Sequence, residues 1–286
     1  MKEKHKGIIY IIISAFFFAV MGFFVRLSGD LPVFEKAFFR NLVSLFISCI
    51  MLRKSSERVK PDKGDFAILF LRSFFGLMGV LCNFYAVDHL LLADAGILNK
   101  LSPFFALLIS ALVLKEKLKP FQVMCVSFAL FGALLVIKPG SGIIAFPAVI
   151  GFLGGASAGF AYTMVRLLGK RGVKGPCIVF FFSLFSCVFI APFMIPDFKP
   201  MTFLQFTYLL LAGLSAAIGQ FAITAAYCHA PAREISVFDY SQIIFSAILG
   251  FIAFRQIPDI LSFAGYAVII LTAAANFIYN NKKSPA

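Results

Sequence analysis

The hydrophobic pattern of this chain consists of long apolar runs that are separated by short polar segments. A helix that crosses a bilayer needs about 20 predominantly apolar residues, and ten runs approach or reach that length. They cover residues 7–27, 33–52, 66–87, 91–114, 120–137, 145–168, 176–196, 203–226, 233–254 and 259–280. The connections leave no room for a soluble domain, so the pattern predicts an all-α integral membrane protein with ten transmembrane helices.

The composition agrees with a protein whose solvent is lipid. Of the 286 residues, 61% are hydrophobic, and the mean hydropathy is +0.95, whereas a soluble domain is about half apolar. The first run follows the basic segment MKEKHKG and imitates a signal peptide. It is longer than the apolar core of a cleaved signal, so we expect it to be retained as the first helix.

The basic residues gather in alternate connections between the runs. The connection at 53–63 holds five of them, and its counterpart in the second half holds one: Arg53, Lys54, Arg58, Lys60 and Lys63 against Lys199. Because Lys and Arg favour the cytoplasmic side, the pattern predicts a protein of the cytoplasmic membrane with both termini inside. The net charge is +13, and most of the basic residues lie in these connections. They do not show the alternation of basic and aromatic residues that binds nucleic acid, so no nucleic-acid partner is expected.

The two halves of the chain repeat each other at an offset of 140 residues. Val25-Arg26-Leu27 matches Val165-Arg166-Leu167, His89 matches His229, and Asn99 stands opposite Asp239. Each half, 1–140 and 141–286, holds five runs, so the second must enter the membrane inverted. Inverted repeats around a central site are the architecture of transporters that work by alternating access.

Four segments carry a resemblance to a known family. They are FFRNLVSLF (38–46), FLRSFFGLMGVLCNFYAV (70–87), LADAGILNKLSPFFALLISALVLKEKL (92–118) and FALFGALLVIKPG (128–140). With these segments the chain resembles an EamA-type member of the drug/metabolite transporter superfamily. The resemblance implies ten helices, two inverted five-helix repeats and a central cavity. It names no substrate, since this superfamily carries amino acids, nucleotide-related metabolites, organic acids and drugs.

The second half departs from the pattern of the first. Ile243 stands where the first half has Pro103, and Arg255-Gln256-Ile257 replaces Lys115-Glu116-Lys117. Arg40 and Arg72 face Phe180 and Ala212 at the offset of 140, so the deep basic residues belong mainly to the first half.

Four charged residues lie deep inside apolar runs: Arg40, Arg72, Lys100 and Asp239. Such residues usually face a cavity or a partner. Lys100 is about nine residues, or about 14 Å, into its run, and Asp239 is about 9 Å into its run from the other side. In a core about 30 Å thick their levels differ by about 7 Å. We therefore expect an ion pair or a shared solute contact if the two helices meet. A permanent Lys100–Asp239 bridge that only fixes helix packing is the alternative.

The remaining candidate site residues are neutral. Hydrogen bonds to a solute are expected from Asn99, Tyr240, Ser102, Gln242 and Asn83, and stacking on a ring from Tyr85 and Tyr162. Pro103 breaks a backbone hydrogen bond and predicts a kink in the fourth helix.

Charged residues near the ends of the runs have simpler interpretations. Arg26, Lys36 and Arg166 are expected to snorkel to the interface. Asp94 and Glu234 occupy matched positions and are expected to start helices, where the helix dipole favours a carboxylate. A gating role for these two carboxylates remains open.

Together these features predict a secondary transporter of a small organic solute, with an anionic or zwitterionic one favoured. Lys100 with Arg72 or Arg40 would meet an acidic group, and Asp239 would meet a cationic group or take up a proton. An exporter of cationic or hydrophobic drugs is the alternative, and a passive channel or a structural membrane protein is a further one. The sequence has no HExxH motif. No serine sits in a GxSxG elbow, because the match Gly155-Ala156-Ser157-Ala158-Gly159 lies inside the apolar run 145–168 and not at a strand-to-helix turn. No enzyme, cofactor or metal is therefore expected. Both a monomer and a homodimer are compatible with it.

Overall fold

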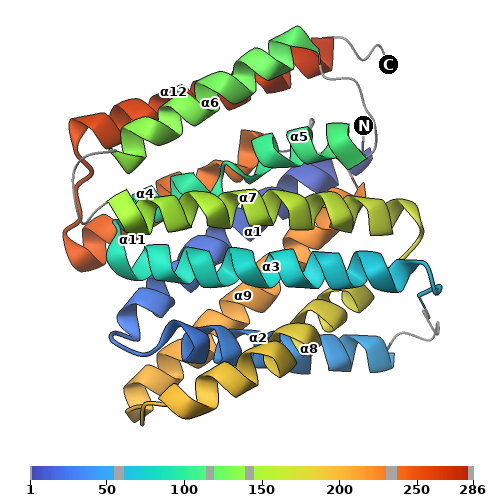
Figure 1. Cartoon of the computed structure of the whole chain (residues 1–286), viewed down its shortest axis with the longest axis vertical. Coiled ribbons are helices and arrows are strands. Elements are labelled where there is room, and N and C mark those ends of the chain that lie inside the picture. Colours follow the sequence, from blue (N-terminus) through green and yellow to red (C-terminus); the bar gives the residue numbers. More distant parts are fainter. Residues whose placement is uncertain (1, 55–60, 114–118, 139–144, 230–236, 283–286) are drawn as a thin grey trace.

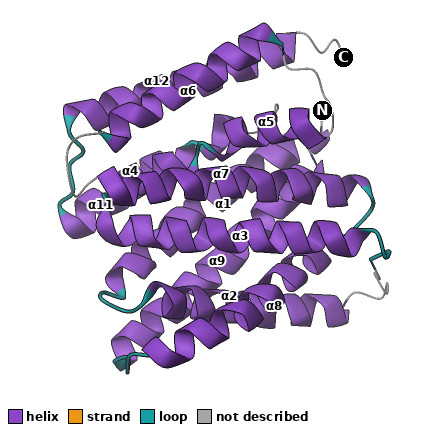
Figure 2. Ribbon diagram, viewed as in Figure 1, coloured by secondary structure: helices purple, strands orange, loops and turns teal. Residues whose placement is uncertain are grey.

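The chain folds into a bundle of helices, shown in Figures 1 and 2. The computed structural model describes residues 2–54, 61–113, 119–138, 145–229 and 237–282. The helices in this part of the chain are α1 (Lys2–Leu27), α2 (Val33–Lys54), α3 (Asp65–His89), α4 (Leu92–Asn99), α5 (Ser102–Val113), α6 (Pro120–Ile137), α7 (Ala145–Lys170), α8 (Gly175–Met194), α9 (Phe203–His229), α11 (Ser241–Phe254) and α12 (Ile260–Lys282). The basic element at 115–118 and Glu234 lie outside the described residues.

The protein is a helical integral membrane protein. In the described residues, nine helical segments are long and apolar enough to cross a membrane. α2 is not among them, although it is 22 residues long. Glu35, Lys36 and Arg40 near its start and Arg53 and Lys54 at its end leave no 18-residue stretch with fewer than three charges. Membrane crossing by α2, and with it the total of ten, stays a prediction.

The helices pack in pairs that are far apart in sequence. α1 lies against α9, α3 against α7, α2 against α8, and α6 against α12. In Figure 1 the α6/α12 pair forms one edge of the bundle and the α2/α8 pair lies toward the opposite edge, with the other two pairs between them. α1 begins and α12 ends at the same end of the bundle. This arrangement agrees with an even number of crossings.

The fourth predicted run, 91–114, is not one continuous helix. It is divided into α4 and α5, and Lys100 and Leu101 form the break between them. Pro103 lies in the first turn of α5, where its missing N–H would have no intrahelical partner anyway. The proline therefore lies at the start of a new helix. The run is broken into two helices, whereas the sequence predicts one helix with a kink.

The ninth run is interrupted in the same way. Residues 237–239 are helical, Tyr240 forms a turn, and α11 begins at Ser241. Tyr240 has φ −68° and ψ −13°, close to the φ −76° and ψ 6° of Lys100, from which it is separated by the offset of 140 residues. Ile243 stands where the first half has proline, so this interruption forms without one.

Candidate functional site

A small cavity lies inside the bundle, among residues of α1, α2, α3, α4, α7, α8, α9 and α11. The space open to the centres of water molecules is about 60 Å³, enough for several waters. It is lined by Phe18, Met21, Arg40, Arg72, Gly76, Gly79, Val80, Asn83, Phe84, Asn99, Ala158, Ala161, Tyr162, Phe182, Gln220 and Gln242. Both halves of the sequence contribute to this lining.

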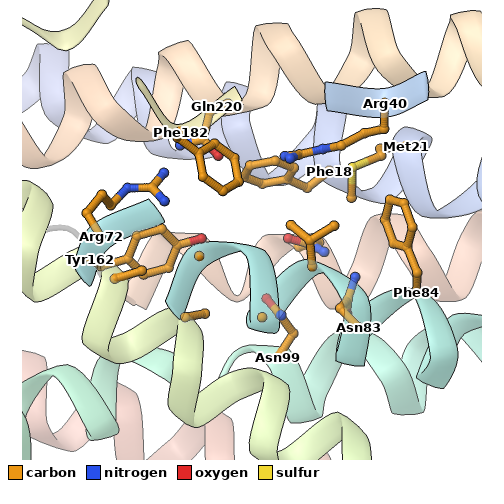
Figure 3. Close-up of a pocket in the computed structure, with 16 residues that line it drawn as sticks. Phe18, Met21, Arg40, Arg72, Asn83, Phe84, Asn99, Tyr162, Phe182 and Gln220 are labelled. Atoms are coloured by element: carbon orange, nitrogen blue, oxygen red, sulfur yellow. The ribbon is translucent and has the colours of Figure 1, made fainter. Parts of the chain in front are cut away.

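Two arginines dominate the charge of the cavity. Arg40 on α2 and Arg72 on α3 are each 2% exposed. Their guanidinium carbons lie 5.4 Å and 4.2 Å from the centre of the Phe182 ring on α8. Figure 3 shows the two guanidinium groups approaching that ring from opposite sides of the view. Phe182 is thus a shared aromatic partner for both cations.

Neither arginine has a carboxylate partner in the described part of the chain. Four ion pairs are present there, and they involve Lys36, Lys100, Lys138 and Arg171. Arg40 donates to Asn41 Oδ1 at 2.8 Å, and the Nε atoms of Arg40 and Arg72 have no hydrogen-bond partner among the described residues. An uncompensated buried charge is unfavourable inside a membrane protein, so this pair of cations is suited to a bound anion.

Gly76 makes room for the Arg72 side chain. A Cβ atom at Gly76 would collide with Arg72 Nη1 and would lie 3.0 Å from Phe182 Cε2. Gly76 follows Arg72 by four residues and therefore lies one turn further along the same face of α3. The missing side chain thus lets the guanidinium pack along α3 beside Phe182.

Neutral polar groups complete the lining. Asn83, Asn99, Gln220 and Gln242 present carboxamides, and Tyr162 presents a phenol. Oε1 of the largely buried Gln242 has no described hydrogen-bond partner, and Gln220 Nε2 donates to Thr224 Oγ1 at 3.4 Å. These groups can donate to an acidic group or accept from a hydroxyl or amine, so the cavity is able to orient a polar solute.

Lys100 and Asp239 lie together at the two helix interruptions. Lys100 Nζ is 2.6 Å from Asp239 Oδ1, and the two side chains are 2% and 0% exposed. Neither oxygen of Asp239 receives a hydrogen bond of good geometry from a described residue. The contact is therefore a close ion pair in which the carboxylate keeps unused acceptor capacity.

Three tyrosines lie within electrostatic range of the Asp239 carboxylate: Tyr162, Tyr227 and Tyr240. The rings of Tyr162 and Tyr227 stack with centroids 5.3 Å apart. The hydroxyls of Tyr227 and Tyr240 are buried without a described hydrogen-bond partner. Because Tyr162 also lines the cavity, it connects the arginine region with the ion pair.

A glycine face of α7 packs against the first interruption. A Cβ atom at Gly155 would collide with the carbonyl oxygen of Leu98, and one at Gly159 would lie 2.6 Å from the carbonyl oxygen of Ser102. The small residues therefore allow α7 to approach the backbone between α4 and α5 directly. This packing places α7 directly against the backbone on both sides of the break.

The structure separates the predicted site residues into three groups. Six line the cavity: Arg40, Arg72, Asn83, Asn99, Tyr162 and Gln242. Lys100, Asp239, Tyr240 and Ser102 are buried at or next to the helix interruptions, outside that lining. Tyr85 is not brought to either place, since its ring stacks on His89 near the end of α3, with centroids 4.2 Å apart.

Several lining residues were not among the sequence candidates. Phe18, Phe84 and Phe182 supply aromatic surface, and Gln220 supplies a carboxamide. Gln220 could have been found, because it is a lone polar residue in the apolar run 203–226 and follows Gly219. No such signal distinguishes three phenylalanines from the other members of a set of 38.

Two basic residues for which the sequence predicts snorkelling contact groups at the end of α3: the buried Lys36 and the partly exposed Arg26. Lys36 is 1% exposed, and its Nζ lies 2.7 Å from Asp88 Oδ1. Arg26 donates to the carbonyl oxygens of Val87 and Leu90 at the end of α3. Lys36 therefore has a carboxylate partner on α3, whereas snorkelling of Arg26 and Arg166 stays a prediction.

Asp94 lies in the first turn of α4, as expected for a carboxylate at a helix start. Its Oδ1 also accepts a hydrogen bond from Tyr266 OH on α12 at 2.6 Å. Asp94 thus connects α4 with the peripheral α6/α12 pair.

A bundle of apolar helices that encloses a charged cavity is typical of membrane transport proteins, and comparisons with known proteins place the chain in that class. The EamA-like transporter family matches residues 5–138. The pseudopaline exporter CntI of Pseudomonas aeruginosa is 32% identical over 272 residues, which cover 94% of this chain and 95% of that protein. The chain therefore belongs to the EamA-like transporter family of the drug/metabolite transporter superfamily.

More distant relatives cover most of the chain as well. Solute carrier family 35 member G1 of Homo sapiens is 26% identical over 92% of this chain and 76% of that protein. The riboflavin transporter of Vibrio cholerae is 24% identical over 99% of this chain and 98% of that protein. A crystal structure of a protein with 17% identity has the same fold, with a TM-score of 0.65 over 97% of this chain and 99% of that one.

Proposed function

We propose that this protein is a secondary transporter of a small organic solute that carries negative charge, either as an anion or as a zwitterion. The observation that carries the proposal is the pair of buried guanidinium groups of Arg40 and Arg72, which face the cavity without a described carboxylate partner. An acidic group of the solute would form charge-assisted hydrogen bonds with them.

The transport cycle is alternating access between two halves, residues 1–140 and 141–286. The packing supports this cycle, since α1 pairs with α9 and α3 pairs with α7. At the offset of 140 residues, α1 corresponds to α7 and α3 to α9, so a twofold axis would exchange these pairs. The interruptions at Lys100 and Tyr240 give each half a broken helix near the centre, where transporters commonly hold their ligands.

The protein would lie in the cytoplasmic membrane with both termini inside. The loop charges support this orientation, and the start of α1 and the end of α12 lie at one end of the bundle. Relatives named as a pseudopaline exporter and as riboflavin transporters support a small-molecule solute. The functions of these relatives differ from one another, so they supply no substrate for this chain.

A hydrophobic or cationic compound is the second candidate. The aromatic rings of Phe18, Phe84 and Phe182 in the lining favour it. Against it stand the two guanidinium groups, which would repel a cation at close range in a medium of low dielectric constant. The anionic solute is therefore the better match to the charge of the cavity.

Ligand-induced stabilisation of the purified protein in detergent tests the proposal. Small carboxylates and amino acids should raise the apparent melting temperature of the wild type, and Arg40→Gln and Arg72→Gln should abolish that rise. Arg171→Gln is the matched control, since Arg171 lies at the end of the bundle and pairs with Asp65 at 3.2 Å. Stabilisation by hydrophobic cations alone would favour the second candidate instead.

Asp239 is proposed as the group that couples transport to protons. Its buried carboxylate touches Lys100 but has unused acceptor capacity. In liposomes, Asp239→Asn should remove the dependence of uptake on a proton gradient while solute exchange persists. The double variant Lys100→Met/Asp239→Asn leaves no unpaired charge and should behave likewise. Wild-type gradient dependence in both variants would exclude Asp239 from coupling.

A further inference from the structure

The two arginines of the cavity are arranged as two separate anion-binding points. Phe182 contacts both guanidinium groups, at 4.2 Å for Arg72 and 5.4 Å for Arg40 from ring centre to guanidinium carbon. In Figure 3 the ring stands between them. Phe182 is 1% exposed, so the ring has little room to leave this position. A single small acidic group would have to displace the ring to bind both cations bidentately.

The charges around the cavity are unbalanced by two. Lys100 and Asp239 neutralise each other at 2.6 Å, whereas Arg40 and Arg72 have no carboxylate within 4.0 Å among the described residues. A solute with one acidic group would leave one guanidinium uncompensated. A solute with two acidic groups would pair both, and planar guanidinium groups suit carboxylate and phosphate alike.

From this arrangement, and resting on the proposed function, we infer that the transported solute carries two acidic groups, one for each arginine, and that Phe182 sets the distance between them. The carboxamides of Asn83, Asn99, Gln220 and Gln242 lie around the same cavity and can donate further hydrogen bonds to acidic oxygens. Gly76 contributes to this arrangement, because its missing side chain leaves room for Arg72 beside the ring.

Matched pairs of small acids test the inference on the purified full chain. Dissociation constants are measured for succinate, glutarate and adipate, and for the monoacids butyrate, valerate and hexanoate of the same carbon number. The best diacid should bind at least about tenfold more tightly than its monoacid, which corresponds to one additional hydrogen-bonded charge pair. Inorganic phosphate, which carries two charges on one group, should resemble the monoacids.

Phe182→Leu tests the role of the ring as a spacer. It should bring the ratio of monoacid to diacid dissociation constants toward one, while monoacid binding persists. Phe189→Leu on the same helix is the control, because Phe189 is 38% exposed and contacts Phe185 and Phe193; it should leave the ratio unchanged. If Phe182→Leu does not fold, the wild-type series decides the question alone.

The outcomes separate this inference from the proposed function. Diacids and monoacids could bind equally well, with Arg72→Gln abolishing the binding of both. That result would overturn the inference of a solute with two acidic groups, but it would be consistent with transport of an anion. Phosphate binding as tight as the best diacid would show that total charge matters rather than two separated groups, and would also overturn it. Failure of every acid to bind at millimolar concentration would remove both proposals.

Discussion

Two pairs of buried groups near the centre of the molecule have opposite electrostatic situations. Lys100 and Asp239 are 2% and 0% exposed and lie 2.6 Å apart, so each compensates the other. Arg40 and Arg72 are each 2% exposed, share the ring of Phe182 and have no described acidic partner. Both pairs are shielded from water, yet only the first is neutral.

The difference separates charge that is compensated within the protein from charge that is not. A buried ion pair stabilises a helix contact only while both members are present. An unpaired buried cation does not stabilise a helix contact in that way. The broken helices therefore hold a self-sufficient pair, whereas α2 and α3 hold an incomplete one, which under the proposed function a solute completes.

The largest expected effect comes from breaking the neutral pair. Lys100→Met should destabilise the protein by about 3–5 kcal/mol, because it leaves the Asp239 carboxylate buried without its cation. The double variant Lys100→Met/Asp239→Asn should recover much of that loss. Reversible unfolding in mixed detergent micelles measures both. A double variant that is less stable than Lys100→Met would show that the two residues do not compensate each other.

The incomplete pair should respond less strongly in the same assay. Arg72→Gln removes a charge that has no described acidic partner, but it also removes the contact with the Phe182 ring. In the absence of any anion it should therefore cost at most about 2 kcal/mol. A loss as large as that of Lys100→Met would mean that Arg72 has a protein partner, and the comparison between the two pairs would fail.

Much of the arrangement could be predicted from the sequence, because lipid imposes a strong pattern. Each predicted run coincides with described helix for all or part of its length, since apolar runs of this length have few other structures open to them. The deep charged residues could also be found, because charge inside an apolar run is rare. The family resemblance was confirmed by relatives that cover nearly the whole chain.

The contacts that give the site its specificity could not be predicted in the same way. The position of Phe182 between two arginines depends on how α8 packs against α2 and α3, which no local periodicity encodes. No proline in the sequence marks the interruption at Tyr240, since Ile243 stands where the first half has Pro103. Tyr85 was chosen for its residue type alone, and its position near the end of α3 takes it to His89 instead. The inverted repeat and the division at 140/141 stay predictions.

The smallest expected effect on stability comes from a change next to Arg72, and it tests whether the position of that arginine matters for anion binding. Gly76→Ala places a Cβ atom against Arg72 Nη1 and 3.0 Å from Phe182 Cε2. Such overpacking destabilises by about 1–3 kcal/mol, offset by about 1 kcal/mol from the higher helix propensity of alanine. The net loss should be about 1 kcal/mol, yet anion binding should fall at least about tenfold, since a displaced guanidinium loses a charge-assisted hydrogen bond.

Gly22→Ala is the matched control, because its Cβ would lie 3.9 Å from Val87 Cγ2 and should be tolerated. Titration of both variants with glutarate, followed by unfolding in micelles, measures the two effects. Unchanged binding in Gly76→Ala would show that the position of Arg72 beside Phe182 is not what makes this cavity receive an anion.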